Sequence, residues 1–115
     1  SKERVQFGRP IGSFQALKHR MADVLARVEM ARSASWAASY ALADPDADPD
    51  EAAFQTHAAA SYALETASLA ASECVQLHGG IAITWEHDAH LVFKRAHALG
   101  RLFGAPHGHR AAVAL

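Results

Sequence analysis

The sequence predicts an all-α fold, arranged as an antiparallel (up-and-down) helical bundle. Alanine, the strongest helix former, supplies 27 of the 115 residues. Strand signals are absent, because no stretch alternates β-branched and polar residues. Clusters of proline or glycine separate long runs in which larger apolar residues recur every three or four positions. A chain of 115 residues has the size of one domain, so we expect residues 1–115 to form a single helical unit.

The first predicted helix follows a turn at residues 7–12, where Pro10 lies between two glycines. Ser13 can cap this helix, which we expect to run to about Ala43. Its length is then roughly 45 Å at 1.5 Å per residue. One face carries apolar residues at alternating spacings of three and four: Phe14, Leu17, Met21, Val24, Val28 and Ala31.

Residues 44–50 form a polar connector that contains two prolines and four aspartates, a composition that stops both neighbouring helices. Asp48 or Asp50 caps a second long helix, predicted over residues 51–77. Its many alanines let a neighbouring helix approach closely. A glycine pair at residues 79–80 ends it.

Two shorter helices complete the predicted bundle. One begins near Glu86 or His87 and runs to about Arg101. A stop at residues 104–106 separates it from a final helix that Pro106 opens and that reaches Val113. The third helix carries a stripe at helical spacing: Val92, Ala96, Leu99 and Phe103.

Two long helices with one shorter partner make a thin slab, which leaves much apolar surface without cover. The large aromatic side chains Trp36, Tyr40 and Trp85 near the helix ends add to it. The chain opens on charged residues without an initiator methionine. We therefore expect a fragment of a longer chain whose first bundle helix is largely missing, or a neighbouring subunit that covers the exposed face.

Composition excludes several classes of function. Eleven Lys and Arg residues against 12 Asp and Glu residues give a net charge of -1, so nucleic acid is not an expected partner. No apolar run approaches the roughly 20 residues that span a bilayer, so no membrane partner is expected. Cys74 is the single cysteine, which fits a reducing, cytoplasmic compartment. We interpret it as a small buried apolar residue rather than a nucleophile.

Eight histidines suggest a metal-binding bundle as one alternative. His87 and His90 share a helix face, and His107 lies two residues before His109. A zinc site needs three or four converging ligands, and the H-E-x-x-H motif is absent from the sequence. We therefore predict no metal site. Glu65 and Glu73 do not form an acid/base pair either, because eight residues of helix separate them by about 12 Å.

Four motifs carry a family resemblance: Arg-Val-Gln-Phe-Gly at residues 4–8, Pro-Ile at 10–11, Phe-Gln at 14–15 and Gln-Leu-His-Gly-Gly at 76–80. In this order and spacing, the chain resembles the C-terminal helical domain of acyl-CoA dehydrogenases over nearly its whole length. The resemblance implies an FAD-dependent oxidoreductase that introduces an α,β double bond into an acyl-CoA thioester. It also implies dimers or tetramers, built from identical or from different subunits.

The resemblance further implies an FAD site that is shared between subunits. Arg4 would bind the FAD pyrophosphate of a neighbouring subunit, because a planar guanidinium meets phosphate oxygens bidentately. A glycine loop without Cβ atoms would bring backbone N–H groups close to the same dinucleotide. The residues implied to contact FAD are Arg4, Gln6, Phe7, Gln15, Gln76, Gly79 and Gly80.

One position departs from the family pattern. The Glu-Gly-Thr motif, whose glutamate abstracts the substrate α-proton in many members, falls on Phe103, Gly104 and Ala105. Phenylalanine cannot accept a proton, so this segment contains no catalytic residue, and we expect the Phe103 ring to pack at the end of the third helix.

Three explanations stay open for the missing base. The base lies upstream of Ser1, or the chain is the non-catalytic subunit of a heteromer, or the chain is a flavin-free helical binding or assembly module. The segment from Phe93 to Gly104 also resembles members that act on large acyl-CoA esters such as sterol side chains.

Overall fold

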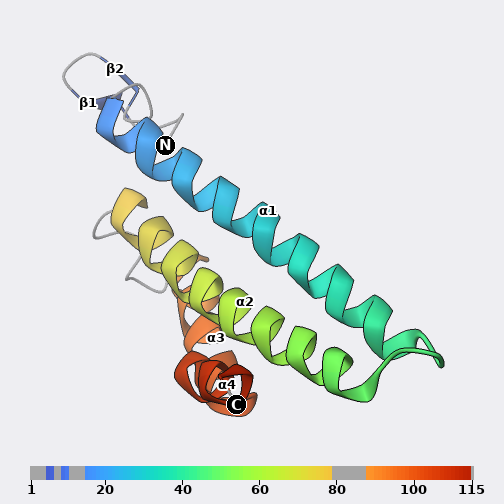
Figure 1. Ribbon diagram of the computed structural model, residues 1–115. Coiled ribbons are helices and arrows are strands. Elements are labelled where there is room, and N and C mark those ends of the chain that lie inside the picture. The colour runs from blue at the N-terminus through green and yellow to red at the C-terminus, as the bar shows by residue number, and fades with distance from the viewer. Residues whose placement is uncertain (1–4, 7–8, 11–14, 79–87, 115) are drawn as a thin grey trace.

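The computed structural model describes residues 5–6, 9–10, 15–78 and 88–114. The predicted all-α fold is confirmed, since every element longer than two residues is a helix. In chain order the elements are β1 (Val5–Gln6), β2 (Arg9–Pro10), α1 (Gln15–Ala43), α2 (Pro49–His78), α3 (Ala89–Leu102) and α4 (Pro106–Val113) (Figure 1).

The two short strands correct the expectation that strands are absent. β1 pairs with β2 in antiparallel register, with Val5 opposite Pro10 and Gln6 opposite Arg9. Strands of two residues are too short to show the alternation by which strands are identified in a sequence. They lie beside the first turn of α1 (Figure 1).

α1 and α2 run antiparallel along the length of the molecule (Figure 1). Between them, the Asp48 carboxylate accepts a 3.1 Å hydrogen bond from the Asp50 N–H, and its carbonyl accepts a 2.9 Å bond from the Ala52 N–H. Pro49 follows at the first helical position, where no N–H donor is needed. Asp48 is therefore the cap of α2, and the helix begins two residues before the predicted start at residue 51.

α2 is the central helix, against which α1, α3 and α4 each pack. In the described part of the chain no side chain is completely buried, and the buried apolar residues are all alanines: Ala38, Ala52, Ala59, Ala71, Ala89 and Ala96. Alanine contacts bring helices close together but contribute little buried area per residue. The helices therefore pack closely without forming a core of large side chains.

The boundaries of α4 confirm the predicted helix from Pro106 to Val113. α3 begins at Ala89, and the residues expected to start it, Glu86 and His87, lie outside the described part of the chain. The stripe expected on α3 is confirmed only in part. Ala96 is buried and Leu99 is half-buried, whereas Val92 and Phe103 are exposed. Ala89 is also buried and Phe93 is half-buried, so the inward face of α3 lies toward these two residues.

The molecule is elongated, with principal extents of 58 × 27 × 23 Å and a radius of gyration of 17.2 Å. A compact chain of this length has a radius of about 13 Å. The accessible surface is 8171 Å², whereas a globular protein of this mass exposes about 6,100 Å². The predicted departure from a globular shape is thus confirmed, but the two short extents are nearly equal, so the molecule is a rod rather than the expected thin slab. None of the helices in the described residues is both long and apolar enough to cross a membrane.

Candidate functional site

The antiparallel pairing of α1 and α2 brings the start of one helix beside the end of the other. β1 and β2 lie at this same end (Figure 1). Of the residues predicted to bind a cofactor, Gln15 is the first residue of α1, Gln76 lies in the last turn of α2, and Gln6 belongs to β1. The fold therefore gathers these three residues at one end of the molecule.

The remaining predicted contacts, Arg4, Phe7, Gly79 and Gly80, lie outside the described residues. The Gln6 side chain also lies outside the part of the chain that the structure describes. Gln15 and Gln76 are both exposed, so their amides are accessible to a ligand. The Gln15 Nε2 group donates a 2.8 Å hydrogen bond to His19 Nε2, one turn along α1.

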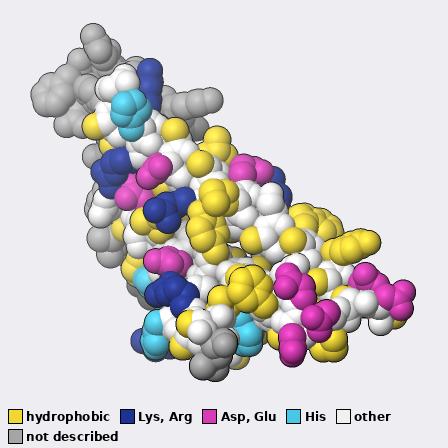
Figure 2. Space-filling model, viewed as in Figure 1, with side chains coloured by type: hydrophobic (Ala, Val, Ile, Leu, Met, Phe, Trp, Pro, Cys, Tyr) yellow, Lys and Arg dark blue, Asp and Glu magenta, His cyan; other side chains and the backbone are white. Residues whose placement is uncertain are grey.

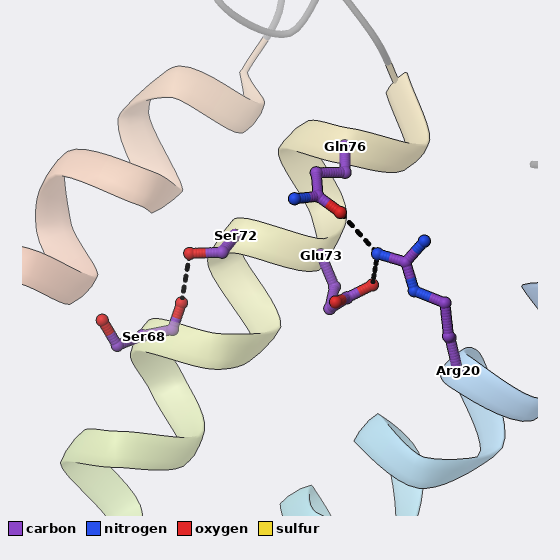
Figure 3. A network of polar contacts seen from close by, with 5 residues as sticks. All are labelled: Arg20, Ser68, Ser72, Glu73 and Gln76. Atoms are coloured by element: carbon purple, nitrogen blue, oxygen red, sulfur yellow. Dashed lines mark hydrogen bonds and ion pairs between the residues drawn. The ribbon is translucent and has the colours of Figure 1, made fainter.

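A polar network joins the two helices at this end (Figure 3). Arg20 Nη2 on α1 lies 2.7 Å from Glu73 Oε2 on α2, and the same nitrogen donates a hydrogen bond to Gln76 Oε1. The Glu73 side chain is 19% exposed and the Arg20 side chain 44% exposed. A carboxylate that has lost most of its hydration needs such a partner.

Arg20 and Glu73 are functional candidates that the sequence analysis missed. The arginine and the amide that it contacts are 56 residues apart in the chain. Their contact depends on the register between two helices, which no local pattern encodes. The nearest sequence signal is that Glu73 precedes Gln76 by three residues, about one helical turn, so both side chains share a face of α2.

A pocket of about 220 Å³ lies beside this network, between α1 and α2. Met21, Val24 and Leu77 form apolar parts of its wall, and Cys74 also lines it. His78 Nδ1 lies 2.8 Å from the Cys74 carbonyl oxygen and 3.7 Å from Cys74 Sγ. Because a carbonyl only accepts, Nδ1 carries the proton and is no base for the thiol. Cys74 is half-buried and lines the pocket, so the expected full burial of this residue is not confirmed.

The turn between α3 and α4 contains Phe103, the residue that the sequence analysis aligns with the family's glutamate. Phe103 caps α3, and Gly104 follows with φ of 92°, a left-handed conformation that favours glycine. The Phe103 side chain is 60% exposed, which corrects the expectation that its ring packs at the end of α3. With Phe103 here, the turn presents no carboxylate.

Two histidines hold this turn in place. The Phe103 carbonyl accepts a 2.8 Å bond from His109 Nε2, so that nitrogen carries a proton. In neutral His109 the other nitrogen, Nδ1, is then an acceptor, and it lies 3.0 Å from Nδ1 of His57. His57 must therefore donate. This chain of bonds fixes the α3–α4 turn to the central helix α2.

Metal ligands and paired carboxylates do not converge in the described residues. No group of three or more His, Cys, Asp or Glu side chains there could hold a metal ion. Glu65 pairs with Arg110 at 3.0 Å, whereas Glu73 pairs with Arg20 at 2.7 Å. The two glutamates thus have separate structural partners.

Comparison with known proteins agrees with this architecture. Residues 1–114 match the family model described as "Acyl-CoA dehydrogenase, C-terminal domain". The helical fold and the ordered motifs define a C-terminal helical domain, and the chain belongs to the acyl-CoA dehydrogenase family.

Several relatives support this assignment. The chain is 54% identical to acyl-CoA dehydrogenase IpdE2 of Mycolicibacterium smegmatis, over 92% of this chain and 31% of that protein. It is 47% identical to acyl-CoA dehydrogenase FadE34 of Mycobacterium tuberculosis, over 90% of this chain and 14% of that protein. The chain thus spans at most about a third of the length of these relatives.

A solved structure has the same fold. It comes from a study of the electron transferring flavoprotein of Acidaminococcus fermentans, and its chain superposes with a TM-score of 0.89 at 29% identity. The likeness covers 99% of this chain and 29% of that chain.

Proposed function

We propose that this chain supplies part of the FAD site of a full-length acyl-CoA dehydrogenase. The observation that carries the proposal is the gathering of Gln6, Gln15 and Gln76 at one end of the molecule, from three separate elements. The exposed amides of Gln15 and Gln76 suit a dinucleotide, whose phosphates and ribose present many hydrogen-bond acceptors. FAD, when bound, supplies the redox chemistry by accepting the hydride from the substrate β-carbon.

The residues of this chain would bind and orient the cofactor. Gln76, at the end of α2, would donate amide N–H groups to it, and Gln15 would contribute a second amide from the start of α1. Arg4 would contact the pyrophosphate of FAD bound to a neighbouring subunit, and Phe7, Gly79 and Gly80 would complete the site.

The proton-abstracting base would come from elsewhere in the assembly. Phe103 has no proton acceptor in its side chain, and the described α3–α4 turn presents none in its place. The base then lies on a segment that precedes residue 1, or on a partner subunit that makes this chain the non-catalytic half of a heteromer. The acyl-CoA substrate is part of this proposal, with a large or sterol side chain as its acyl group.

We further propose that the outer face of α1 packs against another subunit or another part of the enzyme. Trp36 and Tyr40 are one helical turn apart on this face, and they are 72% and 76% exposed. Figure 2 shows hydrophobic side chains reaching the surface along the α1 side of the molecule. The accessible surface of the elongated molecule, larger than that of a globular protein of the same mass, agrees with such packing. A cytoplasmic location belongs to the same proposal, since a lone free thiol suits a reducing compartment.

Flavin content tests the proposed function. The full-length protein, expressed with any partner subunit, is expected to purify with the visible absorbance of bound FAD and to reduce an electron acceptor in the presence of an acyl-CoA. A colourless protein that neither binds added FAD nor turns over any acyl-CoA would contradict the proposal and favour a flavin-free assembly module.

A further inference from the structure

The contact between Arg20 and Gln76 sets the orientation of the Gln76 side-chain amide. Gln76 lies in the last turn of α2 and is exposed, so its amide has no packing that would set its orientation. Arg20, from the neighbouring helix α1, donates a hydrogen bond to Gln76 Oε1. Figure 3 shows the amide oxygen directed at the guanidinium and the amide nitrogen on the opposite side.

This orientation follows from the chemistry of the two groups. A guanidinium has five N–H donors and no acceptor, so it attracts the oxygen of an amide and disfavours the NH₂ group. In the reversed orientation, the NH₂ group of Gln76 would face the N–H donors of Arg20, and no hydrogen bond would form. Gln76 therefore presents its N–H donors away from Arg20.

Glu73 holds the arginine in position for this contact. Its carboxylate lies 2.7 Å from the same nitrogen, Arg20 Nη2, that contacts Gln76. Glu73 belongs to α2, as Gln76 does, and lies about one helical turn before it. Glu73 also balances the charge of Arg20, so the pair as a whole adds no net charge to this end of the molecule.

We propose that Arg20 is a positioning residue for the cofactor site, which holds the Gln76 amide so that its N–H groups are offered to an acceptor on FAD, a phosphate oxygen above all. This inference rests on the proposed function, in which Gln76 contacts the dinucleotide. A phosphate accepts hydrogen bonds and cannot donate them when ionised. A Gln76 amide that turned freely would present its oxygen part of the time and repel the phosphate.

The test is a double-mutant cycle on the full-length protein, with any partner subunit. The FAD dissociation constant of the stripped protein is measured by titration with FAD. We expect Gln76→Ala to raise this constant about tenfold, since a hydrogen bond to a charged group is lost. Arg20→Met, which keeps the aliphatic stem, should raise it about threefold to fivefold.

The double variant Arg20→Met with Gln76→Ala distinguishes positioning from a separate role. If Arg20 acts through Gln76, the double variant binds FAD as the Gln76→Ala variant does, because the two effects are not additive. Additive effects of the two substitutions would overturn the positioning role. So would an unchanged FAD affinity of the Arg20→Met variant when the Gln76→Ala variant binds FAD more weakly. Either result would leave the proposed FAD site in place. Unchanged affinity in the Gln76→Ala variant would instead remove Gln76 from the proposed site, and the positioning role with it.

Removing Arg20 also leaves Glu73 with an unbalanced charge, which could itself repel FAD. The variant Arg20→Met with Glu73→Gln removes both charges. We expect it to bind FAD as weakly as Arg20→Met does. Full recovery of FAD affinity would show that the unpaired charge of Glu73 caused the loss, and would overturn the positioning role. Arg20→Lys, which keeps a donor and the positive charge, should recover part of the affinity.

Arg32→Met is the matched control. Arg32 is on α1 too, and its partner Glu29 lies one turn away on the same helix at 3.0 Å. Its removal should leave FAD affinity unchanged. Thermal unfolding of each variant is recorded with the titrations. If Arg20→Met alone does not fold, the double variant Arg20→Met with Glu73→Gln is used in its place. A wild-type FAD affinity of this double variant would overturn the proposal.

Discussion

Two regions of the molecule differ in the polar groups that they present. At the start of α1 and the end of α2, Arg20, Glu73 and Gln76 form a polar network between helices beside an exposed amide. The α3–α4 turn contains Phe103, whose carbonyl accepts a hydrogen bond from His109. The first region offers an exposed amide beside its polar network, whereas the hydrogen bonds of the second hold a turn in place.

Under the proposed function, this difference separates cofactor binding from proton abstraction within the domain. The contacts between Arg20, Glu73 and Gln76 depend on the register of α1 against α2. The close packing of alanines between the two helices sets this register. The α3–α4 turn depends on a glycine with φ of 92° and on two histidines, which keep the backbone path without a carboxylate. Under the same proposal, the chain keeps the fold and the cofactor groups while the base is supplied elsewhere.

The largest expected effect comes from Arg4→Ala in the full-length protein, because a charge-assisted contact to phosphate would be lost. Such a contact contributes about 1.5–3 kcal/mol, so FAD affinity should fall by roughly ten- to a hundredfold. Flavin content after gel filtration measures it. Lys2→Ala is a control with the same loss of charge nearby. Equal flavin content in the wild type and the Arg4→Ala variant would show that the family motif has another role here.

Replacing Trp36 and Tyr40 by serine tests a third surface, the outer face of α1, which belongs neither to the α1–α2 network nor to the α3–α4 turn. If the outer face of α1 is an interface, losing two exposed aromatics there should weaken assembly by about 2 kcal/mol or more. Sedimentation of the full-length protein measures the shift toward smaller species. Unchanged assembly would mean that this face is not the interface.

The third effect concerns the α3–α4 turn, where His109→Ala removes the bonds to the Phe103 carbonyl and to His57. We expect a loss of about 1–2 kcal/mol in the free energy of unfolding. Thermal unfolding measures it, with His107→Ala, an exposed position on the same helix, as the control. FAD affinity should stay unchanged, and a variant that loses FAD without losing stability would undo the separation of the two regions.

Phe103→Glu has the smallest expected effect on stability, less than about 1 kcal/mol, because the ring is 60% exposed. We also expect no gain in acyl-CoA turnover, since a second carboxylate near an existing base would repel it. The assay compares the two proteins with any partner subunit present. A clear rise in turnover would mean that the position of the base was vacant and that the chain is a decayed enzyme.

The sequence predicts the helices well, because their signals are local. Proline and glycine mark the ends, and alanine content marks the interiors, so α4 is predicted to the residue and α2 to within two residues of its start. The elongated shape follows from helix length alone. The two-residue strands were missed because they are too short for a pattern.

The sites were less predictable because their contacts are distant in the chain. The Arg20–Gln76 bond and the His57–His109 contact span 56 and 52 residues, so each depends on how helices are aligned. The spacing of apolar residues predicted the inward face of α3 only in part: Ala96 is buried as expected, but Ala89 packs inward as well, while the larger Val92 is exposed. Small side chains that permit close packing outweigh larger apolar ones at that contact.

Hydrogen exchange of the full-length protein, with and without FAD, tests the separation of the two regions most directly. The account predicts that FAD slows amide exchange in peptides from the first turns of α1 and the last turns of α2, and leaves peptides from residues 99–113 unchanged. Protection of the α3–α4 turn, with no change at the α1–α2 end, would contradict it.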